Sequence, residues 1–165
     1  MISLGGSDSK YGTVAYKTVE VTDLGPKSNS VCQIANLPEP VYAHSATYTK
    51  NGLLVCGGNT FHDQSYQITN KCHILMSNRS WVPFNSFKQS RYYFSMTTLK
   101  EKVVTIGGLR AENSIEYLSL ETESKWETKT LPFTVNYHCA VAINDSTIMI
   151  IGGAQDGKVF RHFNC

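Results

Sequence analysis

Four pairs of adjacent glycines recur along the chain at intervals of 45 to 52 residues, and this repetition restricts the possible folds more than any other feature. The pairs are Gly5-Gly6, Gly57-Gly58, Gly107-Gly108 and Gly152-Gly153. A short apolar run precedes each pair. Self-similarity at such a period is the signature of repeat architectures, in which each repeat is one supersecondary unit. We therefore expect repeated units of one structural type along the whole chain.

The apolar runs are predicted to be buried strands. They cover residues 2–4, 53–56, 103–106 and 148–151, and their β-branched and aliphatic side chains favour strands covered on both faces. In the last three repeats a second apolar stretch lies upstream, beyond a short polar segment at 49–52, 100–102 or 144–146. The Asn51-Gly52 pair is typical of a type I′ hairpin turn. Each of these repeats is therefore expected to begin with an antiparallel hairpin.

Two further strands are expected after each hairpin. Residues 115–120 alternate apolar and polar side chains, as a third strand would, and Trp126 marks the start of a fourth. Trp81 marks the same point one repeat earlier. Because the tryptophans recur at one repeat position, we interpret them as packing residues and not as ligand-stacking residues. No stretch repeats its apolar residues at helical spacing over two turns, so we expect almost no helix.

These features together resemble kelch repeats, in which a double glycine ends the second strand, an aromatic lies on the third and a tryptophan opens the fourth. The residues that carry the resemblance are Gly57, Gly58, Trp81, Gly107, Gly108, Tyr117, Trp126, Gly152 and Gly153. The resemblance implies an all-β fold, a kelch-type β-propeller of about three and a half four-stranded blades in an incomplete ring.

We expect a single partial propeller over residues 1–165. A partial blade with strands two to four is expected in 1–38, complete blades in 39–88 and 89–133, and a partial blade with strands one to three in 134–165. An open ring exposes unpaired backbone and an apolar face at its terminal blades. Two explanations stay open. The chain is a piece of a longer protein, or it self-associates or pairs with another protein through these open blade edges.

The same position of the repeat, upstream of the glycine pair, holds His44, Phe94 and His138 in three successive repeats. The recurrence predicts that each of the two histidines makes an inner-strand hydrogen bond to a neighbouring blade, and it argues against a metal site. The glycines themselves are expected where a neighbouring blade approaches closely and a Cβ atom would be penalised.

The five cysteines include one pair of obvious geometric partners. Cys56 lies on the second strand and Cys72 on the third strand of one blade, and these strands are neighbours, so we predict a disulfide. Two buried free thiols are the alternative. Cys139 is interpreted as a packing residue, while Cys32 and Cys165 are available to pair with residues outside the chain. Some extracellular kelch proteins of invertebrates are similar in having Cys-Gly-Gly followed by a cysteine on the next strand.

Asn78 and Asn144 each begin an Asn-x-Ser sequence in a predicted turn, so both are candidates for N-glycosylation. Together with the predicted disulfide, they favour an extracellular or secreted location, and a cytoplasmic location is the alternative. The first residues lack a basic stretch followed by a long apolar core, so no signal peptide is expected in the sequence shown.

Charge and motifs argue against several classes of function. The formal net charge is +2, from 15 basic and 13 acidic residues scattered along the chain, so nucleic acid is not an expected partner. The apolar runs are far shorter than the roughly 20 residues of a membrane helix, so no membrane-spanning segment is expected. Histidines at metal-ligand spacing, Cys-x-x-Cys and a phosphate-binding lysine after the glycines are all absent. We therefore predict no catalytic residue, metal ligand or cofactor.

The best candidates for partner binding lie on loops of one propeller face. Residues 59–64 are predicted to form the longest such loop. Arginine and aromatic side chains dominate many protein interfaces, and the candidates chosen on this ground or from this loop are Phe61, His62, Arg91, Tyr92 and Arg110. We expect a non-catalytic kelch-repeat module that binds a protein or glycan. The resemblance also implies two alternatives, the substrate-recognition propeller of an intracellular ubiquitin-ligase adaptor and a fragment of a galactose-oxidase-like copper enzyme.

Overall fold

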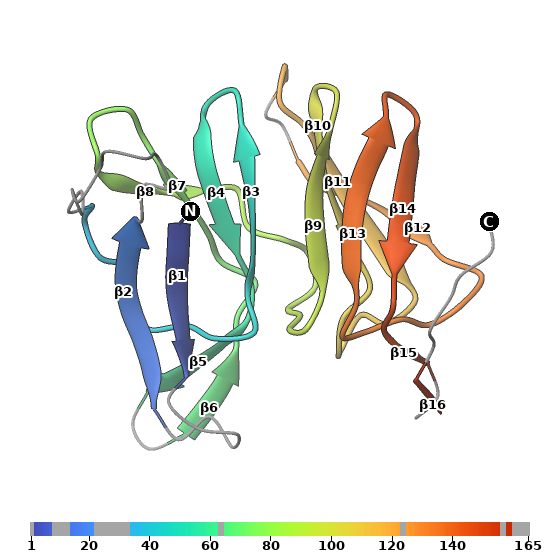
Figure 1. The fold of residues 1–165 in the computed structure, drawn as a ribbon, viewed down its shortest axis with the longest axis horizontal. Coiled ribbons are helices and arrows are strands. Elements are labelled where there is room, and N and C mark those ends of the chain that lie inside the picture. Colours follow the sequence, from blue (N-terminus) through green and yellow to red (C-terminus); the bar gives the residue numbers. More distant parts are fainter. Residues whose placement is uncertain are drawn as a thin grey trace, which may run out of the picture.

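The computed structural model describes residues 2–7, 14–21, 34–62, 65–122, 125–155 and 158–159. This part of the chain is all-β, with antiparallel strands joined by turns and loops and without any helix. Figure 1 shows the strands gathered into small sheets that follow one another in chain order from the N-terminus to the C-terminus. Within these ranges no helix has the length and apolar character that crossing a bilayer requires.

Two complete four-stranded antiparallel sheets form the centre of the structure (Figure 1). The first has the spatial order β3 (Ser45–Thr49), β4 (Gly52–Cys56), β7 (Cys72–Leu75) and β8 (Trp81–Phe84). The second has the order β9 (Ser95–Leu99), β10 (Lys102–Ile106), β11 (Ser114–Ser119) and β12 (Glu127–Thr130). In both sheets the paired glycines directly follow the second strand, as the repeat predicts.

A two-stranded sheet flanks each side of this centre. On one side are β1 (Ile2–Ser7) and β2 (Ala15–Val21), and on the other are β13 (Cys139–Asn144) and β14 (Thr147–Ile151). A short hairpin of β15 (Ala154–Gln155) and β16 (Lys158–Val159) follows. The strand expected near residues 31–33, the end of the last expected strand, and both Cys32 and Cys165 lie outside the described residues.

Residues 59–62, the described part of the expected loop 59–64, are not irregular, so that expectation is wrong for them. They form β5 (Asn59–His62), which pairs with β6 (Ser65–Ile68), and Phe61 lies opposite Tyr66. The alternation of polar and larger side chains over these residues fits a strand, since a hairpin satisfies backbone groups that a loop would leave to solvent.

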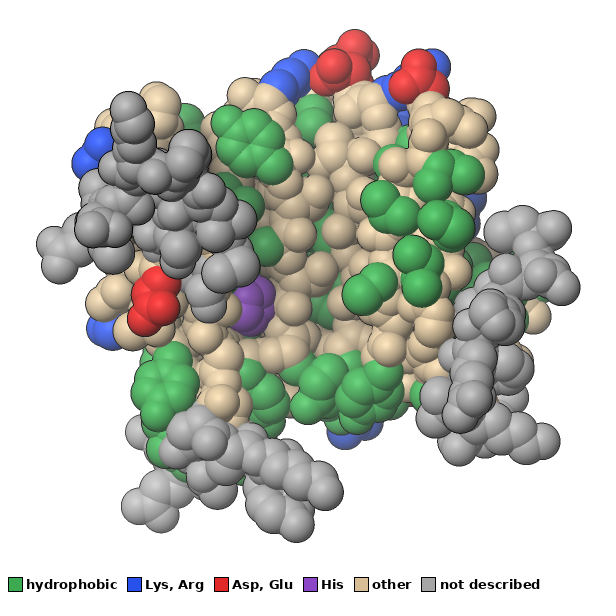
Figure 2. All heavy atoms as spheres, viewed as in Figure 1, with side chains coloured by type: hydrophobic (Ala, Val, Ile, Leu, Met, Phe, Trp, Pro, Cys, Tyr) green, Lys and Arg blue, Asp and Glu red, His purple; other side chains and the backbone are tan. Residues whose placement is uncertain are grey.

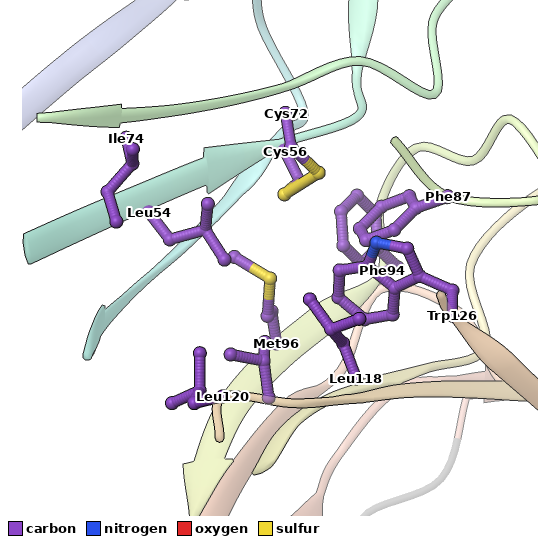
Figure 3. Packing of buried hydrophobic residues seen from close by; sticks show 11 residues of the cluster. Leu54, Cys56, Cys72, Ile74, Phe87, Phe94, Met96, Leu118, Leu120 and Trp126 are labelled. Atoms are coloured by element: carbon purple, nitrogen blue, oxygen red, sulfur yellow. A yellow bond between two sulfur atoms is a disulfide. The ribbon is translucent and has the colours of Figure 1, made fainter. Parts of the chain in front are cut away.

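Three hydrophobic clusters lie between successive sheets and hold the stack together. The largest joins the two four-stranded sheets and is shown in Figure 3, with Leu54 and Ile74 facing Phe94, Leu118 and other side chains of the next sheet. A second cluster lies between β1-β2 and the first four-stranded sheet, and a third between the second such sheet and β13-β14. Each four-stranded sheet is therefore covered on both faces, which explains why its second strand, β4 or β10, is largely apolar.

The glycine pairs lie where successive sheets touch. A Cβ atom on Gly57 would come within 2.9 Å of the Arg91 carbonyl oxygen, and one on Gly107 within 2.2 Å of the Val135 carbonyl oxygen. The next residue of each pair, Gly58 or Gly108, donates its N–H to the same carbonyl at 2.8 or 2.9 Å. All four glycines have positive φ. Both the backbone conformation and the close approach therefore require a residue without a side chain.

The turn between β3 and β4 has the expected register but not the expected type. Thr49 pairs with Gly52, so two residues form the loop, yet Lys50 and Asn51 do not have the positive φ that a type I′ turn needs. Gly52 has a φ of 139°, and a Cβ atom there would lie 2.1 Å from the Leu75 carbonyl oxygen. The glycine is thus explained by contact with β7 and not by a type I′ turn.

The prediction that His44 and His138 make hydrogen bonds to neighbouring blades is wrong. Nδ1 of His44 and both ring nitrogens of His138 are buried without a hydrogen-bond partner among the described residues. Cε1 of His44 lies 3.2 Å from where a Cβ atom on Gly5 would stand, so this ring packs against the preceding sheet. The recurring position, which holds Phe94 in the middle repeat, therefore selects a ring that fills space.

The two tryptophans make equivalent contacts. The indole N–H of Trp81 donates to the Ala35 carbonyl at 2.8 Å, and that of Trp126 donates to the Asn85 carbonyl at 2.7 Å. Each acceptor lies in the segment that leads into the sheet carrying the tryptophan. Both side chains thus fix the connection between successive sheets, which agrees with a packing role.

Candidate functional site

One edge of the stacked sheets carries a row of aromatic side chains that we name the tyrosine rim. Its members are Tyr42, Phe61, Tyr66, Tyr92, Tyr93 and Tyr137. Figure 2 shows hydrophobic side chains along the lower edge of the molecule, where Figure 1 places the β5-β6 hairpin and the loops that lead into β9 and β13. The rim therefore combines residues from three successive repeats.

The rings of the rim contact one another in two groups. Tyr93 and Tyr137 are stacked, with ring centres 4.2 Å apart, and Tyr92 lies 5.2 Å from Tyr93. Tyr66 lies 5.0 Å from Phe61 and 6.3 Å from Tyr42. Tyr66 and Tyr137 remain 48% and 56% exposed, so about half of each side chain is available to a partner.

Three equivalent loops position the rim. Ala43, Tyr93 and Tyr137 have φ values of 54°, 52° and 53°, a left-handed conformation that costs about 1 kcal/mol for residues with a side chain. Backbone hydrogen bonds connect these residues across the repeats, from Tyr93 N–H to the Ala43 carbonyl at 3.0 Å and from Tyr137 N–H to the Tyr93 carbonyl at 2.9 Å. Strained backbone of this kind persists when its surroundings hold it, and it often accompanies a binding function.

A bridge to the residues just after a glycine pair holds each of these three loops in place. Tyr42 pairs with Asn59, Tyr92 with Leu109, and Asn136 with Ala154. Arg110 follows Leu109 directly, has a φ of 77°, and is exposed. An exposed arginine therefore lies one residue beyond the position that pairs with Tyr92.

Two tyrosines of the rim, Tyr42 and Tyr137, have a raised pKa, so their hydroxyl groups stay protonated at neutral pH. Burial is the main cause that raises the pKa of Tyr42, partly opposed by its hydrogen bond with Asn59. Burial also raises the pKa of Tyr137, with smaller contributions from Tyr93 and Tyr92. The rim thus offers neutral ring faces and hydroxyl groups that both donate and accept hydrogen bonds.

The expectation that Arg91 contributes to a binding surface is wrong. Arg91 is 0% exposed and forms an ion pair with the equally buried Glu116, with Nη2 and Oε1 2.5 Å apart. Its Nη1 also donates to the Gly107 carbonyl at 3.0 Å, while the backbone N–H groups of Lys88 and Gln89 donate to Glu116. Burial lowers the pKa of Arg91, and the adjacent carboxylate opposes that change. Arg91 therefore connects the loop before β9 to β10 and β11.

The other candidates from the sequence lie near the rim. Tyr92 and Phe61 are rim members and half-buried, and Arg110 is exposed on the neighbouring loop. His62 pairs with Ser65 at the end of the β5-β6 hairpin. The candidate list from the sequence omits Tyr42, Tyr66, Tyr93 and Tyr137. A signal for two of them exists, since Tyr93 and Tyr137 directly precede the repeat position of Phe94 and His138.

Cys56 and Cys72 form a disulfide, as predicted. They pair directly across β4 and β7 with Cα atoms 4.1 Å apart, and both are buried in the cluster between the four-stranded sheets (Figure 3). The Gly57 N–H donates to the Lys71 carbonyl, which marks the cysteine pair as the narrow, non-hydrogen-bonded type. Cys139, in contrast, is an exposed free thiol, so its interpretation as a packing residue is wrong.

The opposite edge is polar. Ion pairs join its hairpin turns, from Lys50 to Glu101 at 2.7 Å and from Lys100 to Asp145 at 3.5 Å. The two sequon asparagines are exposed: Asn78 lies in the turn between β7 and β8, and Asn144 ends β13. Within the described part of the chain, no three side chains of His, Cys, Asp or Glu gather as a metal site would need.

Antiparallel four-strand sheets that stack face to face, with paired glycines at each contact, define a β-propeller-type repeat protein with an aromatic rim. The arrangement and the comparisons agree with a resemblance to kelch-repeat proteins. Kelch-like protein 36 of Rattus norvegicus and of Mus musculus are each 23% identical to the chain over 161 residues, and that of Bos taurus is 24% identical over 162 residues.

These alignments cover 93% of the chain but 25% of each relative, so the chain spans about a quarter of the length of the curated relatives it matches. No protein-family model matches the chain.

Proposed function

We propose that the chain is a non-catalytic binding module, and that its tyrosine rim contacts a protein or glycan partner. The stacked pair of Tyr93 and Tyr137 on strained loops, with Tyr137 more than half exposed, carries this proposal. Aromatic side chains with two rotatable bonds lose little conformational entropy on binding, and they lose still less when the backbone that carries them is already rigid.

The chemistry of the rim supports a partner that is itself amphipathic. Ring faces pack against apolar side chains or the faces of sugar rings, and the hydroxyl groups supply directional hydrogen bonds. Arg110 adds an exposed cation on the loop that pairs with Tyr92, and Phe61 is a further ring of the rim. We propose these three residues, with His62, as contributors to the same surface.

The disulfide supports an extracellular setting for this module. Disulfides persist in oxidising compartments and are rare in the cytosol. A buried disulfide between Cys56 and Cys72 therefore favours the secreted binding module over an intracellular ubiquitin-ligase adaptor. Thiol counting on unfolded, unreduced protein isolated from its source separates the two: three or fewer reactive thiols support the secreted module, and five support the adaptor.

The test of the rim compares two kinds of tyrosine. A partner recovered by cross-linking to the wild-type surface is purified, and its affinity is measured by calorimetric titration against variants of the chain. Tyr93→Ala and Tyr137→Ala are each expected to weaken binding roughly tenfold or more, as central aromatic contacts do.

Tyr48→Ala is the matched control, because Tyr48 is 75% exposed near the opposite end of β3. Its affinity is expected to equal that of the wild type. An unchanged affinity in both rim variants, or an equal loss in the control, would contradict the proposed function.

A further inference from the structure

The chain contains two Asn-x-Ser/Thr sequences, and both lie in exposed turns between antiparallel strands. Asn78 lies in the turn between β7 and β8, and Asn144 ends β13 just before the turn into β14. Both asparagines are exposed. A glycan on either side chain would extend into solvent without displacing a packed residue.

The two sequons share one geometry. Asn78 Oδ1 accepts hydrogen bonds from the N–H and hydroxyl of Ser80 at 3.1 and 2.6 Å. Asn144 Oδ1 accepts the same two bonds from Ser146 at 2.9 and 3.0 Å. Neither Nδ2 atom has a hydrogen bond with the described residues, so the nitrogen that would carry a sugar points to no protein partner.

Asn70 provides a contrast within the same chain. It begins an Asn-x-Cys sequence, a weaker form of the sequon, but its Nδ2 donates to the Phe87 carbonyl at 2.8 Å. Its third residue, Cys72, is in the disulfide. The Asn70 amide nitrogen and the Cys72 sulfur are therefore both engaged inside the fold. The amide nitrogens of Asn78 and Asn144 have no such partner among the described residues.

Both sequons lie on the edge opposite the tyrosine rim. Leu75 pairs with Leu53 beside the β3-β4 turn, which places the Asn78 turn next to Lys50 and Asn51. Asp145 pairs with Lys100 of the β9-β10 turn. Figure 1 shows these turns together at the top of the view and the β5-β6 hairpin at the bottom. Glycans at this edge would leave the rim uncovered.

From these observations we propose that Asn78 and Asn144 each carry an N-linked glycan. The buried disulfide supports passage through the oxidising lumen in which N-glycosylation occurs. The co-substrate is an oligosaccharide linked to a lipid pyrophosphate. A bond forms from Nδ2 to C1 of the first sugar, the C1–oxygen bond breaks, the lipid pyrophosphate leaves with the electron pair, and Nδ2 loses one proton. This inference is independent of what the rim binds.

The test uses the natural full-length coding sequence, tagged and expressed in eukaryotic cells, with peptide-N-glycosidase digestion as the readout. The wild type is expected to lose one glycan from Asn78 and one from Asn144, each seen as a step of electrophoretic mobility during partial digestion and assigned to its asparagine by mass spectrometry. Asn78→Gln, Ser80→Ala, Asn144→Gln and Ser146→Ala should each remove one step. Ser80→Thr and Ser146→Thr keep the acceptor sequence and should retain both, and Asn70→Gln should change nothing.

A second arm places a secretory leader in front of the same chain. A natural protein that is insensitive to the enzyme overturns the proposal, even where the leader-fused protein is glycosylated. A single step in the wild type overturns the proposal for whichever asparagine proves unmodified by mass spectrometry. Secretion of folded Asn78→Gln and Asn144→Gln protein excludes misfolding as the cause of a lost step.

Discussion

Gly107 shows how one missing side chain governs the approach of two sheets. A Cβ atom there would lie 2.2 Å from the Val135 carbonyl oxygen, whereas a Cβ atom on Gly152, in the equivalent position of the next repeat, would meet nothing within 4 Å. Their φ values are 56° and 67°, so the backbone strain of a substitution is matched. Any difference in stability between a Gly107 variant and the matching Gly152 variant therefore measures the effect of the close contact alone.

Gly107→Ala is predicted to lower the free energy of unfolding by about 3 kcal/mol or more, because it adds overpacking to the strain of positive φ. Gly152→Ala should lower it by about 1 kcal/mol, from strain alone. Urea unfolding of both variants, followed by tryptophan fluorescence, measures the difference. Equal losses would mean that close approach does not explain the first glycine of the pair.

The hairpin of β4 and β7 is closed by the disulfide between Cys56 and Cys72, which are 16 residues apart in sequence. Cross-linking a loop of this length stabilises a fold by about 3 kcal/mol in the chain-entropy account. The Cys56→Ala/Cys72→Ala variant should therefore unfold at markedly lower urea concentration, and reducing agent should destabilise the wild type but not this variant. Cys139→Ala, at the exposed free thiol, is the control and should behave as the wild type.

A wild-type unfolding curve that reducing agent does not shift would contradict the contribution assigned to this bond. So would an equal loss of stability in the Cys139→Ala control.

Strands and their partners could be predicted from the sequence, because glycine pairs, apolar runs and polar turns are local signals. The disulfide followed from the same local register. The burial of Arg91 could not be predicted, because it depends on an ion pair with Glu116, a residue 25 positions later. The alternation of apolar and polar residues along β11 suggests that Glu116 faces solvent. The rim was missed for a similar reason. Tyr137 becomes a neighbour of Tyr93 only when successive sheets stack, and Tyr66 becomes a neighbour of Phe61 through a hairpin that was expected to be a loop.

At the scale of the whole molecule, the stack presents three surfaces of different character. The tyrosine rim occupies one edge and the charged turns with the two sequons occupy the other. A third surface is the outer face of β13-β14, where Val141, Ile143, Met149 and Ile151 are 40–55% exposed. Figure 2 shows hydrophobic side chains over this sheet. The equivalent faces of the preceding sheets are covered by a neighbouring sheet, so we propose this face as the place where the chain would self-associate or meet a further blade.

The stack also contains two histidines with buried ring nitrogens, His44 and His138, and they make its stability depend on pH. Burial lowers the pKa of His44 and of His138 from 6.5 to about 4. Unfolding returns each ring to water, where its pKa is about 6.5. In the interval between these values the unfolded chain binds protons that the folded chain does not. The stabilisation by neutral rings is therefore complete above about pH 6.5 and is lost as the pH falls towards 4.

Each histidine is predicted to account for about 2 kcal/mol of lost unfolding free energy between pH 7 and pH 5. Phe94 occupies the same repeat position between them, so His44→Phe and His138→Phe replace a titrating ring with one that the fold already accepts. Urea unfolding at both pH values should show a smaller pH dependence in each single variant and a still smaller one in the double variant. If the double variant loses as much stability on acidification as the wild type, the histidines are not the acid-sensitive groups of the stack.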